Sequence, residues 1–342
     1  MRFVICGAGA IGSTIGGYLA LKDHPVVLVA RPAHASAIQE KGLTLKTAGG
    51  ELRPDLQAVT DVSELEWTDH DIIFMTSKSQ NTRTLLDGLS GAPKQTPLFC
   101  FQNGVRNEEW AAESFDRVYG GLVVFSVNYL EPGAIEHTRN DVIAIGKFPE
   151  GLDDVTTRVG EALSEAGFRV TLDEAVMPPK WGKMLLNLNN AVYALVDTWL
   201  QLAYTEPKSR RFLAETMREG LAVIRALGIE SQMGPGEPDV PEFIEQLEGG
   251  GFGSPDAADL APSRRTYPST WQDVVMGRAG TEVEHFNGEI VKLGQQSGIP
   301  TPYNSTLLEM MGELSERRLQ PGAFSLNDIQ QRVQEKIDEP RP

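Results

Sequence analysis

A lysine and two asparagines in one apolar stretch form the first group that could do chemistry. Residues 180–190 read KWGKMLLNLNN, and Lys183, Asn187 and Asn190 stand at i, i+4 and i+7, on one face of a predicted helix. Asparagine inside a helix competes for backbone hydrogen bonds, so its repeated use indicates a polar face that lines a cleft. In a cleft that excludes water, Lys183 could act as a general acid and protonate the alkoxide formed by hydride addition to a carbonyl. The alternative is a surface lysine beside asparagines that join helices.

A second polar cluster lies between residues 269 and 288. Thr281 and Glu284 have the spacing of a capping box, with Thr at the N-cap and Glu at N3 of a helix. This assignment leaves Glu282 in the first helical turn, free to point into a cleft, so Glu282 is the better functional candidate. The hydroxyl of Ser269 could bind a substrate carboxylate, although a serine that begins a helix is an equal alternative.

Hydride chemistry needs a cofactor, and residues 1–31 predict a unit that binds a dinucleotide. An apolar strand (2–6) is followed by a GxGxxG turn, a helix (13–22) and a second strand (25–30). The first glycine suits a tight turn, the second lets backbone approach a pyrophosphate, and the third lets the helix pack closely on the strand. Free N–H groups at the helix N-terminus would face the anion. The predicted cofactor-binding turn consists of Gly7, Ala8, Gly9, Ala10, Ile11 and Gly12.

The residue at the end of the second strand selects the dinucleotide. An Asp or Glu there would accept hydrogen bonds from a ribose 2′-hydroxyl, whereas an arginine accommodates a 2′-phosphate. Here the residue is Arg31, so the sequence favours NADPH over NADH. The alternative is that Arg31 is only a solvated cation at a strand end.

Two further polar residues follow predicted strands. Lys78 comes after the strand at 71–76, and Asn103 comes after the strand at 97–101. Ligands of an open α/β sheet bind outside the carboxyl ends of its strands, so Lys78 could meet a phosphate or a substrate carboxylate. Asn103 could serve nicotinamide and substrate with a donor and an acceptor. The alternatives are an exposed lysine and ordinary Asn-Gly turn chemistry.

The distribution of strand and helix patterns predicts an α/β protein with two domains. Strand signals end near residue 173, which gives a Rossmann-type dinucleotide-binding domain at 1–173 and an all-α substrate and dimerisation domain at 174–342. The first domain also includes a predicted hairpin at 117–147. Stretch 233–268 is too irregular for one long helix and is predicted as a lid, a mobile loop or a solvated insertion. Long helices are predicted at 176–198, 207–227, 282–297 and 303–318.

Composition narrows the class of partners. The 342 residues carry a net charge of −16, which argues against a general nucleic-acid or anionic-membrane surface.

Cys6 and Cys100 lie in apolar strand-like runs, so buried thiols are expected in place of a disulfide or metal site. With no signal-peptide pattern and no apolar run of roughly 20 residues, a cytoplasmic protein without a membrane span is expected.

In combination, these motifs resemble the ketopantoate reductase (2-dehydropantoate 2-reductase) family, in matching order over most of the chain. The resemblance implies an NADPH-dependent 2-oxoacid reductase with a Rossmann domain and a helical C-terminal domain. The matching features are GAGAIG at the N-terminus, Arg31, Lys78, QNG at 102–104, KWxKxxxN at 180–187 and GRAGTEVEHFNG at 277–288.

The resemblance also implies roles for individual residues. Lys183 becomes the general acid, Asn187 supports it and the substrate, and Glu282 binds the substrate hydroxyl. Asn103 and Lys78 then lie at cofactor and substrate, and Ser269 lies at the substrate carboxylate. The family's second helix asparagine usually follows the first by four residues, but position 191 is alanine here, so Asn190 is expected to substitute.

Reduction of ketopantoate to pantoate is the leading prediction, and several alternatives stay open. The family resemblance also admits a different 2-oxoacid, because the segment before Ser269 departs from the family pattern. A β-hydroxyacid dehydrogenase also uses a Lys-x-x-x-Asn helix, but its Gly-rich substrate loop ahead of that helix is missing. An NADPH sensor without turnover would need neither Lys183 nor Glu282. A homodimer is a further expectation that the sequence leaves open.

Overall fold

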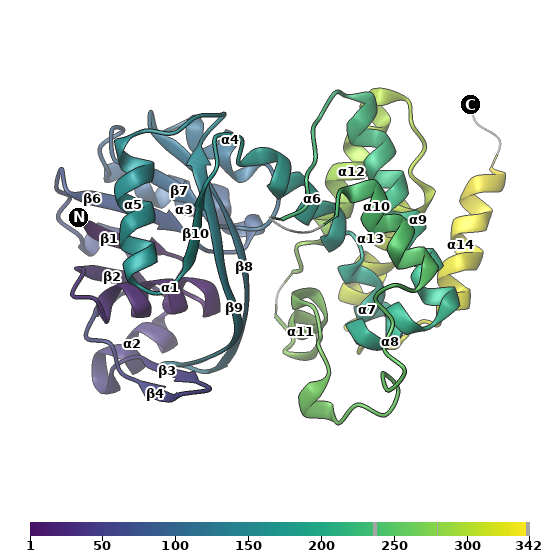
Figure 1. Cartoon of the computed structure of the whole chain (residues 1–342), viewed down its shortest axis with the longest axis horizontal. Coiled ribbons are helices and arrows are strands. Elements are labelled where there is room, and N and C mark those ends of the chain that lie inside the picture. Colours follow the sequence, from purple (N-terminus) through teal and green to yellow (C-terminus); the bar gives the residue numbers. More distant parts are fainter. Residues whose placement is uncertain (235–237, 279, 340–342) are drawn as a thin grey trace. The chain divides into compact units, whose positions relative to one another are not determined.

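The computed structural model describes residues 1–234, 238–278 and 280–339, apart from the side chains of residues 139 and 140. The chain divides into two compact units, Met1–Met177 and Pro178–Pro342. The first unit is an α/β domain and the second is helical, which confirms the predicted fold class (Figure 1).

One mixed sheet organises the first unit. Six of its strands run parallel in the order β5-β2-β1-β6-β7-β8, which is the 3-2-1-4-5-6 order of a Rossmann fold. The predicted hairpin at 117–147 is confirmed, because β9 pairs antiparallel with β8; β3 and β10 then pair with β9. The strands are β1 (Arg2–Cys6), β2 (Val26–Val29), β3 (Thr44–Thr47), β4 (Gly50–Leu52), β5 (Gln57–Val59), β6 (Asp71–Met75), β7 (Leu98–Cys100), β8 (Val118–Glu131), β9 (Ala134–Lys147) and β10 (Arg169–Leu172).

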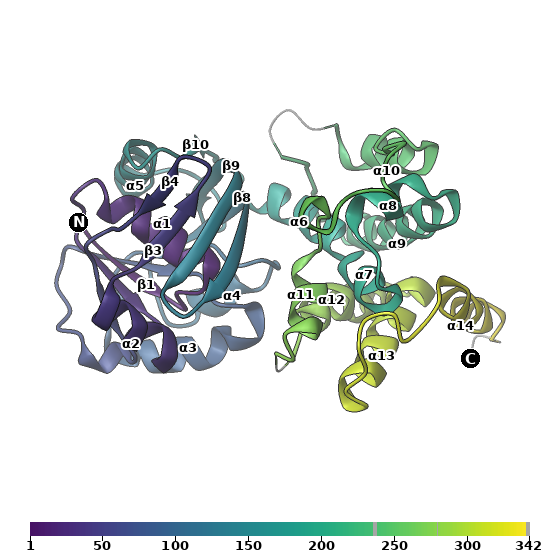
Figure 2. The same cartoon turned by 90° about the horizontal axis from the view of Figure 1, so that it is seen from below.

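Helices cover both faces of this sheet (Figure 1, Figure 2). The alternating side chains of strand β1 accordingly enter two separate cores: Phe3 and Ile5 pack with residues of α1, α2 and α5, whereas Val4 and Cys6 pack with residues of α3 and α4. Both cysteines are free and buried, as predicted. The helices are α1 (Ala10–Ala20), α2 (Pro32–Lys41), α3 (Thr82–Gly88), α4 (Asn107–Ala112) and α5 (Asp154–Glu165), with short 3-10 turns η1 (Val62–Glu64), η2 (Ser79–Asn81) and η3 (Leu89–Gly91).

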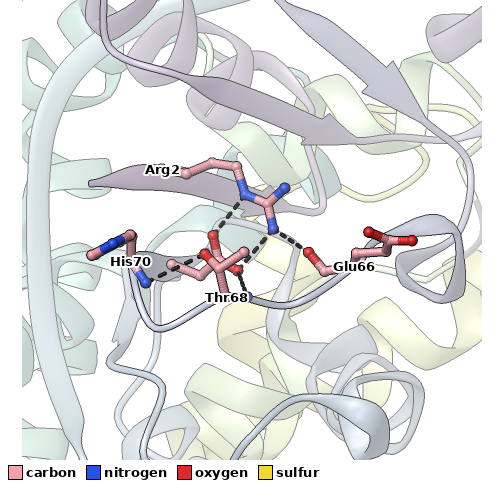
Figure 3. A network of polar contacts seen from close by, with 5 residues as sticks. Arg2, Glu66, Thr68 and His70 are labelled. Carbon is pink, nitrogen blue, oxygen red and sulfur yellow. Dashed lines mark hydrogen bonds and ion pairs between the residues drawn. The ribbon is translucent and has the colours of Figure 1, made fainter.

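A partly buried ion pair joins the first residues of β1 and β6, which are register partners. The Arg2 guanidinium donates to both carboxylate oxygens of Asp71, at 2.6 and 2.8 Å, and to the Glu66 carbonyl at 2.7 Å (Figure 3). The Asp71 carboxylate also accepts the Thr68 N–H at 2.7 Å. This network lies at the amino ends of the two strands. It therefore stabilises the sheet and leaves the carboxyl ends free for ligands.

Helix α9 is the central element of the second unit and packs against α8, α10, α12 and α13. Helix α11 packs on α7, and the amphipathic α14 packs on α13. Among the described residues, no helix has the length and apolar character needed to cross a bilayer. The helices are α6 (Met177–Asn187), α7 (Asn190–Val196), α8 (Leu200–Thr205), α9 (Pro207–Ala226), α10 (Val240–Gly249), α11 (Ser269–Val275), α12 (Val283–Ser297), α13 (Pro302–Glu316) and α14 (Leu326–Asp338), with the 3-10 turn η4 (Pro262–Arg264).

One prediction of helix extent was wrong. The predicted helix at 176–198 is interrupted between α6 and α7, where Val192 N–H donates to the Asn189 carbonyl, three residues back, at 3.0 Å. As predicted, the described part of stretch 233–268 does not form one long helix; it contains α10, which packs on α9, and the 3-10 turn η4. Its role as a lid, a mobile loop or a solvated insertion stays a prediction. Residues 235–237 of that stretch lie outside the described residues.

Candidate active site

The glycine-rich turn after β1 has the geometry that each glycine was predicted to provide. Gly7 has a φ of +83°, and a Cβ there would lie 2.5 Å from the Cβ of Ser77. A Cβ on Gly12 would lie 2.3 Å from Oγ1 of Thr76, so only glycine lets α1 pack this closely. In contrast, a Cβ on Gly9 would meet nothing nearer than a backbone oxygen at 3.9 Å. The space beside Gly9, where a side chain would begin, is therefore open for a ligand.

The N-terminus of α1 is suited to an anion. Gly9 is its N-cap residue, no side chain caps the helix, and its first turn contains no acidic residue. The first N–H groups of a helix have no partner within the helix, and the helix dipole adds positive potential at that end. The turn and the helix start together can hold a pyrophosphate.

The loops after β6 and β7 meet this turn at the carboxyl edge of the sheet. Gln102 donates to the Ser77 hydroxyl at 3.2 Å, and Ser77 also lies against Gly7. The Ser79 hydroxyl donates to the Asn103 carbonyl at 2.6 Å. The half-buried Lys78 and Asn103 are thereby brought to the strand-end edge that carries the glycine turn. Gly104 has a φ of +81°, so the Asn-Gly pair also makes a turn.

Arg31 is exposed and occupies the N-cap position of α2, two residues after the end of β2. A buried histidine one turn later, His34, anchors this helix start. The Gly133 N–H donates to His34 Nδ1 at 2.9 Å, which assigns the proton to Nε2, and Nε2 lies 3.0 Å from the Ser13 hydroxyl of α1. Burial lowers the pKa of His34, which favours the neutral ring. His34 thus anchors the backbone at the start of α2, where Arg31 is the N-cap residue, a role that the sequence pattern did not indicate.

In the second unit, the Lys183 ammonium lies within electrostatic reach of the Glu282 carboxylate. Burial lowers the pKa of the Lys183 ammonium to about 8, the like charge of Lys180 adds to this shift, and the Glu282 carboxylate opposes it. Glu282 is only 4% exposed. A lysine with this pKa can give up a proton near neutral pH, which an ordinary surface lysine does poorly.

The predicted capping box at the start of α12 was wrong. The helix begins at Val283, and Glu282 occupies the N-cap position without a side-chain capping bond. Thr281 therefore lies outside the helix, and Glu284 lies in its first turn. Glu282 therefore lies at the start of α12, where its carboxylate opposes the lowering of the pKa of Lys183.

Asn187 is the last residue of α6 and Asn190 is the first residue of α7, so the two lie on either side of the helix break and not on the single helix that was predicted. Asn190 Nδ2 lies 3.4 Å from Asn187 Oδ1, across the turn that joins α6 to α7. The Nδ2 of Asn187 is buried and has no hydrogen-bond partner within the described part of the chain. A buried donor without a partner is costly, and a ligand oxygen would satisfy it.

Ser269 is the first residue of α11 and is half-buried, with Pro268 in the N-cap position. The structure thus places it at a helix start, one of its two predicted roles, and its contact with substrate remains a prediction. Four residues further along α11, Asp273 is 1% exposed and pairs with Arg278 at 3.2 Å. Within the described ranges, no group of three or more His, Cys, Asp and Glu side chains could hold a metal ion.

Each of the two units matches a known protein family. Residues 3–150 match the model of the family described as "Ketopantoate reductase PanE/ApbA", and residues 175–315 match the model of its C-terminal domain. A relative from Pyrococcus abyssi named 2-dehydropantoate 2-reductase is 30% identical over 312 residues, 90% of this chain and 95% of that protein.

Solved structures show the same fold. A ketopantoate reductase of this family from Ralstonia eutropha JMP134 is 26% identical, with a TM-score of 0.79 over 93% of this chain and 99% of that one. A D-mandelate dehydrogenase, solved with NADH and anilino(oxo)acetate, is 24% identical, with a TM-score of 0.80 over the same shares of the two chains. This chain therefore belongs to the ketopantoate reductase family and is an oxidoreductase.

Proposed function

We propose that this chain is an NADPH-dependent reductase of 2-oxoacids and that ketopantoate, reduced to pantoate, is its leading substrate. The observation that carries the proposal is Lys183 itself, whose ammonium lies within electrostatic reach of the buried Glu282 carboxylate and whose pKa is lowered to about 8 by burial. The names of the relatives support the substrate. A sensor without turnover would have no use for such a lysine.

The first unit would hold the cofactor. The open space beside Gly9 and the uncapped start of α1 suit a pyrophosphate, while Arg31 at the end of β2 suits a ribose 2′-phosphate. Lys78 and Asn103 would complete the site at the carboxyl edge. When bound, the nicotinamide supplies a hydride to the 2-oxo carbon. The D-mandelate dehydrogenase was solved with NADH, so Arg31 is the feature that favours NADPH here.

The second unit would bind the oxoacid and supply the proton. The Lys183 ammonium donates a proton to the substrate oxygen as negative charge develops there. Glu282 accepts a hydrogen bond from the substrate hydroxyl, and the unpartnered Nδ2 of Asn187 donates to a substrate oxygen. Asn190 orients that amide, and the Ser269 hydroxyl would receive the carboxylate.

This role of Lys183 predicts an alkaline limit to the reductase. A general acid must be protonated, and the pKa of Lys183 is lowered to about 8, so kcat/KM for the oxoacid should be constant below that pH and fall about tenfold per unit above it. The reverse reaction needs the neutral amine and should rise over the same range. Steady-state rates between pH 6 and about 10 would check both limbs. A reductive rate that stays flat through this range would contradict the assignment.

A larger or aromatic 2-oxoacid is the second candidate substrate. Tyr267 and Trp271, on either side of Ser269 in the chain, stack with their ring centroids 3.8 Å apart, and Trp199 lies 6.5 Å from Tyr267. Aromatic rings beside a predicted carboxylate site suit an apolar substrate group. Faster turnover of an aromatic 2-oxoacid than of ketopantoate would favour this candidate.

A further inference from the structure

The break between α6 and α7 leaves a buried backbone carbonyl that a side chain from another helix satisfies. In a continuous helix the Leu188 carbonyl would accept the Val192 N–H, but that N–H donates to Asn189 instead. Leu188 is fully buried, so water cannot replace the lost bond. Asn287 of α12, itself fully buried, donates its Nδ2 to the Leu188 carbonyl at 3.0 Å.

Asn287 is in turn held by a chain of buried polar groups. Its Nδ2 also donates to Asn304 Oδ1 at 2.9 Å, and Asn304 Nδ2 donates to Glu219 Oε1 at 2.7 Å. The Glu219 carboxylate accepts the N–H groups of Tyr303 and Asn304 at 2.9 and 2.8 Å, at the start of α13. The network therefore fixes the Asn287 amide with groups from α9 and α13, and buried networks of this kind impose one arrangement on a core.

The hydrogen bond between Asn287 and the Leu188 carbonyl joins two segments that both carry residues of the proposed active site. Leu188 lies between Asn187 and Asn190, and α12 begins directly after Glu282. We propose that Asn287 is a positioning residue that stabilises the helix break and so sets Asn187, Asn190 and Lys183 in their places relative to Glu282. This inference rests on the proposed reductase function. It assigns Asn287 no contact with substrate.

Asn287→Asp tests the inference with little change of shape. The substitution replaces the donor with a carboxylate oxygen that faces two acceptors, the Leu188 carbonyl and Asn304 Oδ1. We expect kcat/KM for the oxoacid to fall by about tenfold to a hundredfold, as is typical of small misplacements of reacting groups. NADPH affinity should not change, because the proposed cofactor residues belong to the first unit. Hydrogen exchange should become faster at the amides of residues 188–190.

Thr306→Val is the matched control, and Asn287→Ser is the second variant. Thr306 is 1% exposed on α13, and its hydroxyl has no hydrogen-bond partner in the described part of the chain, so its loss should change neither rate nor exchange. If Asn287→Asp does not fold, Asn287→Ser decides, since serine is too short to reach the Leu188 carbonyl. If the wild type turns over a 2-oxoacid and the Asn287 variants show the same kcat/KM as Thr306→Val, the positioning role of Asn287 is overturned but the proposed function is not. A wild type without turnover of any 2-oxoacid would instead overturn the proposed function.

Discussion

Replacing Lys183 by alanine should reduce turnover of the 2-oxoacid by about a hundredfold to ten-thousandfold, the range typical of a lost acid–base group. The reason is that no water molecule can replace an ammonium placed where charge develops on the substrate oxygen. NADPH affinity should change little, because Lys183 belongs to the second unit. Stopped-flow measurement of NADPH oxidation, together with a cofactor titration by fluorescence, separates the two quantities.

Two further variants make this experiment specific to proton donation. Lys183→Arg keeps the positive charge but holds its proton too tightly to donate it, so turnover should stay low. Lys292→Ala removes an exposed lysine of α12 and should leave all rates unchanged. If Lys183→Ala retained turnover within a few-fold of the wild type, Lys183 would have no part in the mechanism.

Replacing Gly9 by valine should greatly weaken NADPH binding without unfolding the protein. The added Cβ meets no atom closer than 3.9 Å, so the melting temperature should not change, but the side chain would occupy the space through which a pyrophosphate approaches the backbone. We expect NADPH affinity to fall more than a hundredfold, about 2.7 kcal/mol or more. Fluorescence titration and thermal unfolding on the same samples would measure both effects.

Other glycines of the first unit supply the contrast. Gly12→Ala places a Cβ 2.3 Å from the Thr76 hydroxyl and 3.0 Å from an Ile5 methyl, so it should lower stability by about 1–3 kcal/mol, as overpacking does. Gly91→Val places a Cβ where no other atom lies within 4 Å, so it should alter neither NADPH affinity nor the melting temperature. Wild-type NADPH affinity in Gly9→Val would rule out the glycine turn as the cofactor site.

Much of the fold could be predicted because its signals are local. The apolar run of β1, the glycine turn and the helix after it are adjacent in sequence, and the period of the later helices is visible along each segment. Helix starts were harder to predict. The Thr281–Glu284 spacing suits a capping box, but the chain places Glu282 at the N-cap, where its carboxylate interacts with Lys183 instead of closing the helix.

The parts of the site that escaped prediction depend on contacts between distant residues. The helix break at Leu188 is stabilised by Asn287, 99 positions away, and no pattern near residue 188 reveals it. The anchoring role of His34 depends on Gly133, also 99 positions away. Lys183 itself could be proposed from its spacing to Asn187, whereas its lowered pKa follows from burial that only the folded unit creates.

The most direct test of the proposed function is the oxidation of NADPH by the wild-type protein, followed at the nicotinamide absorbance, with ketopantoate and a small panel of other 2-oxoacids, and with NADH as the second cofactor. We expect sustained turnover with NADPH, the formation of pantoate from ketopantoate, and slower turnover with NADH because Arg31 favours a 2′-phosphate. A protein that binds NADPH but oxidises it with none of these acids would contradict the assignment as a 2-oxoacid reductase.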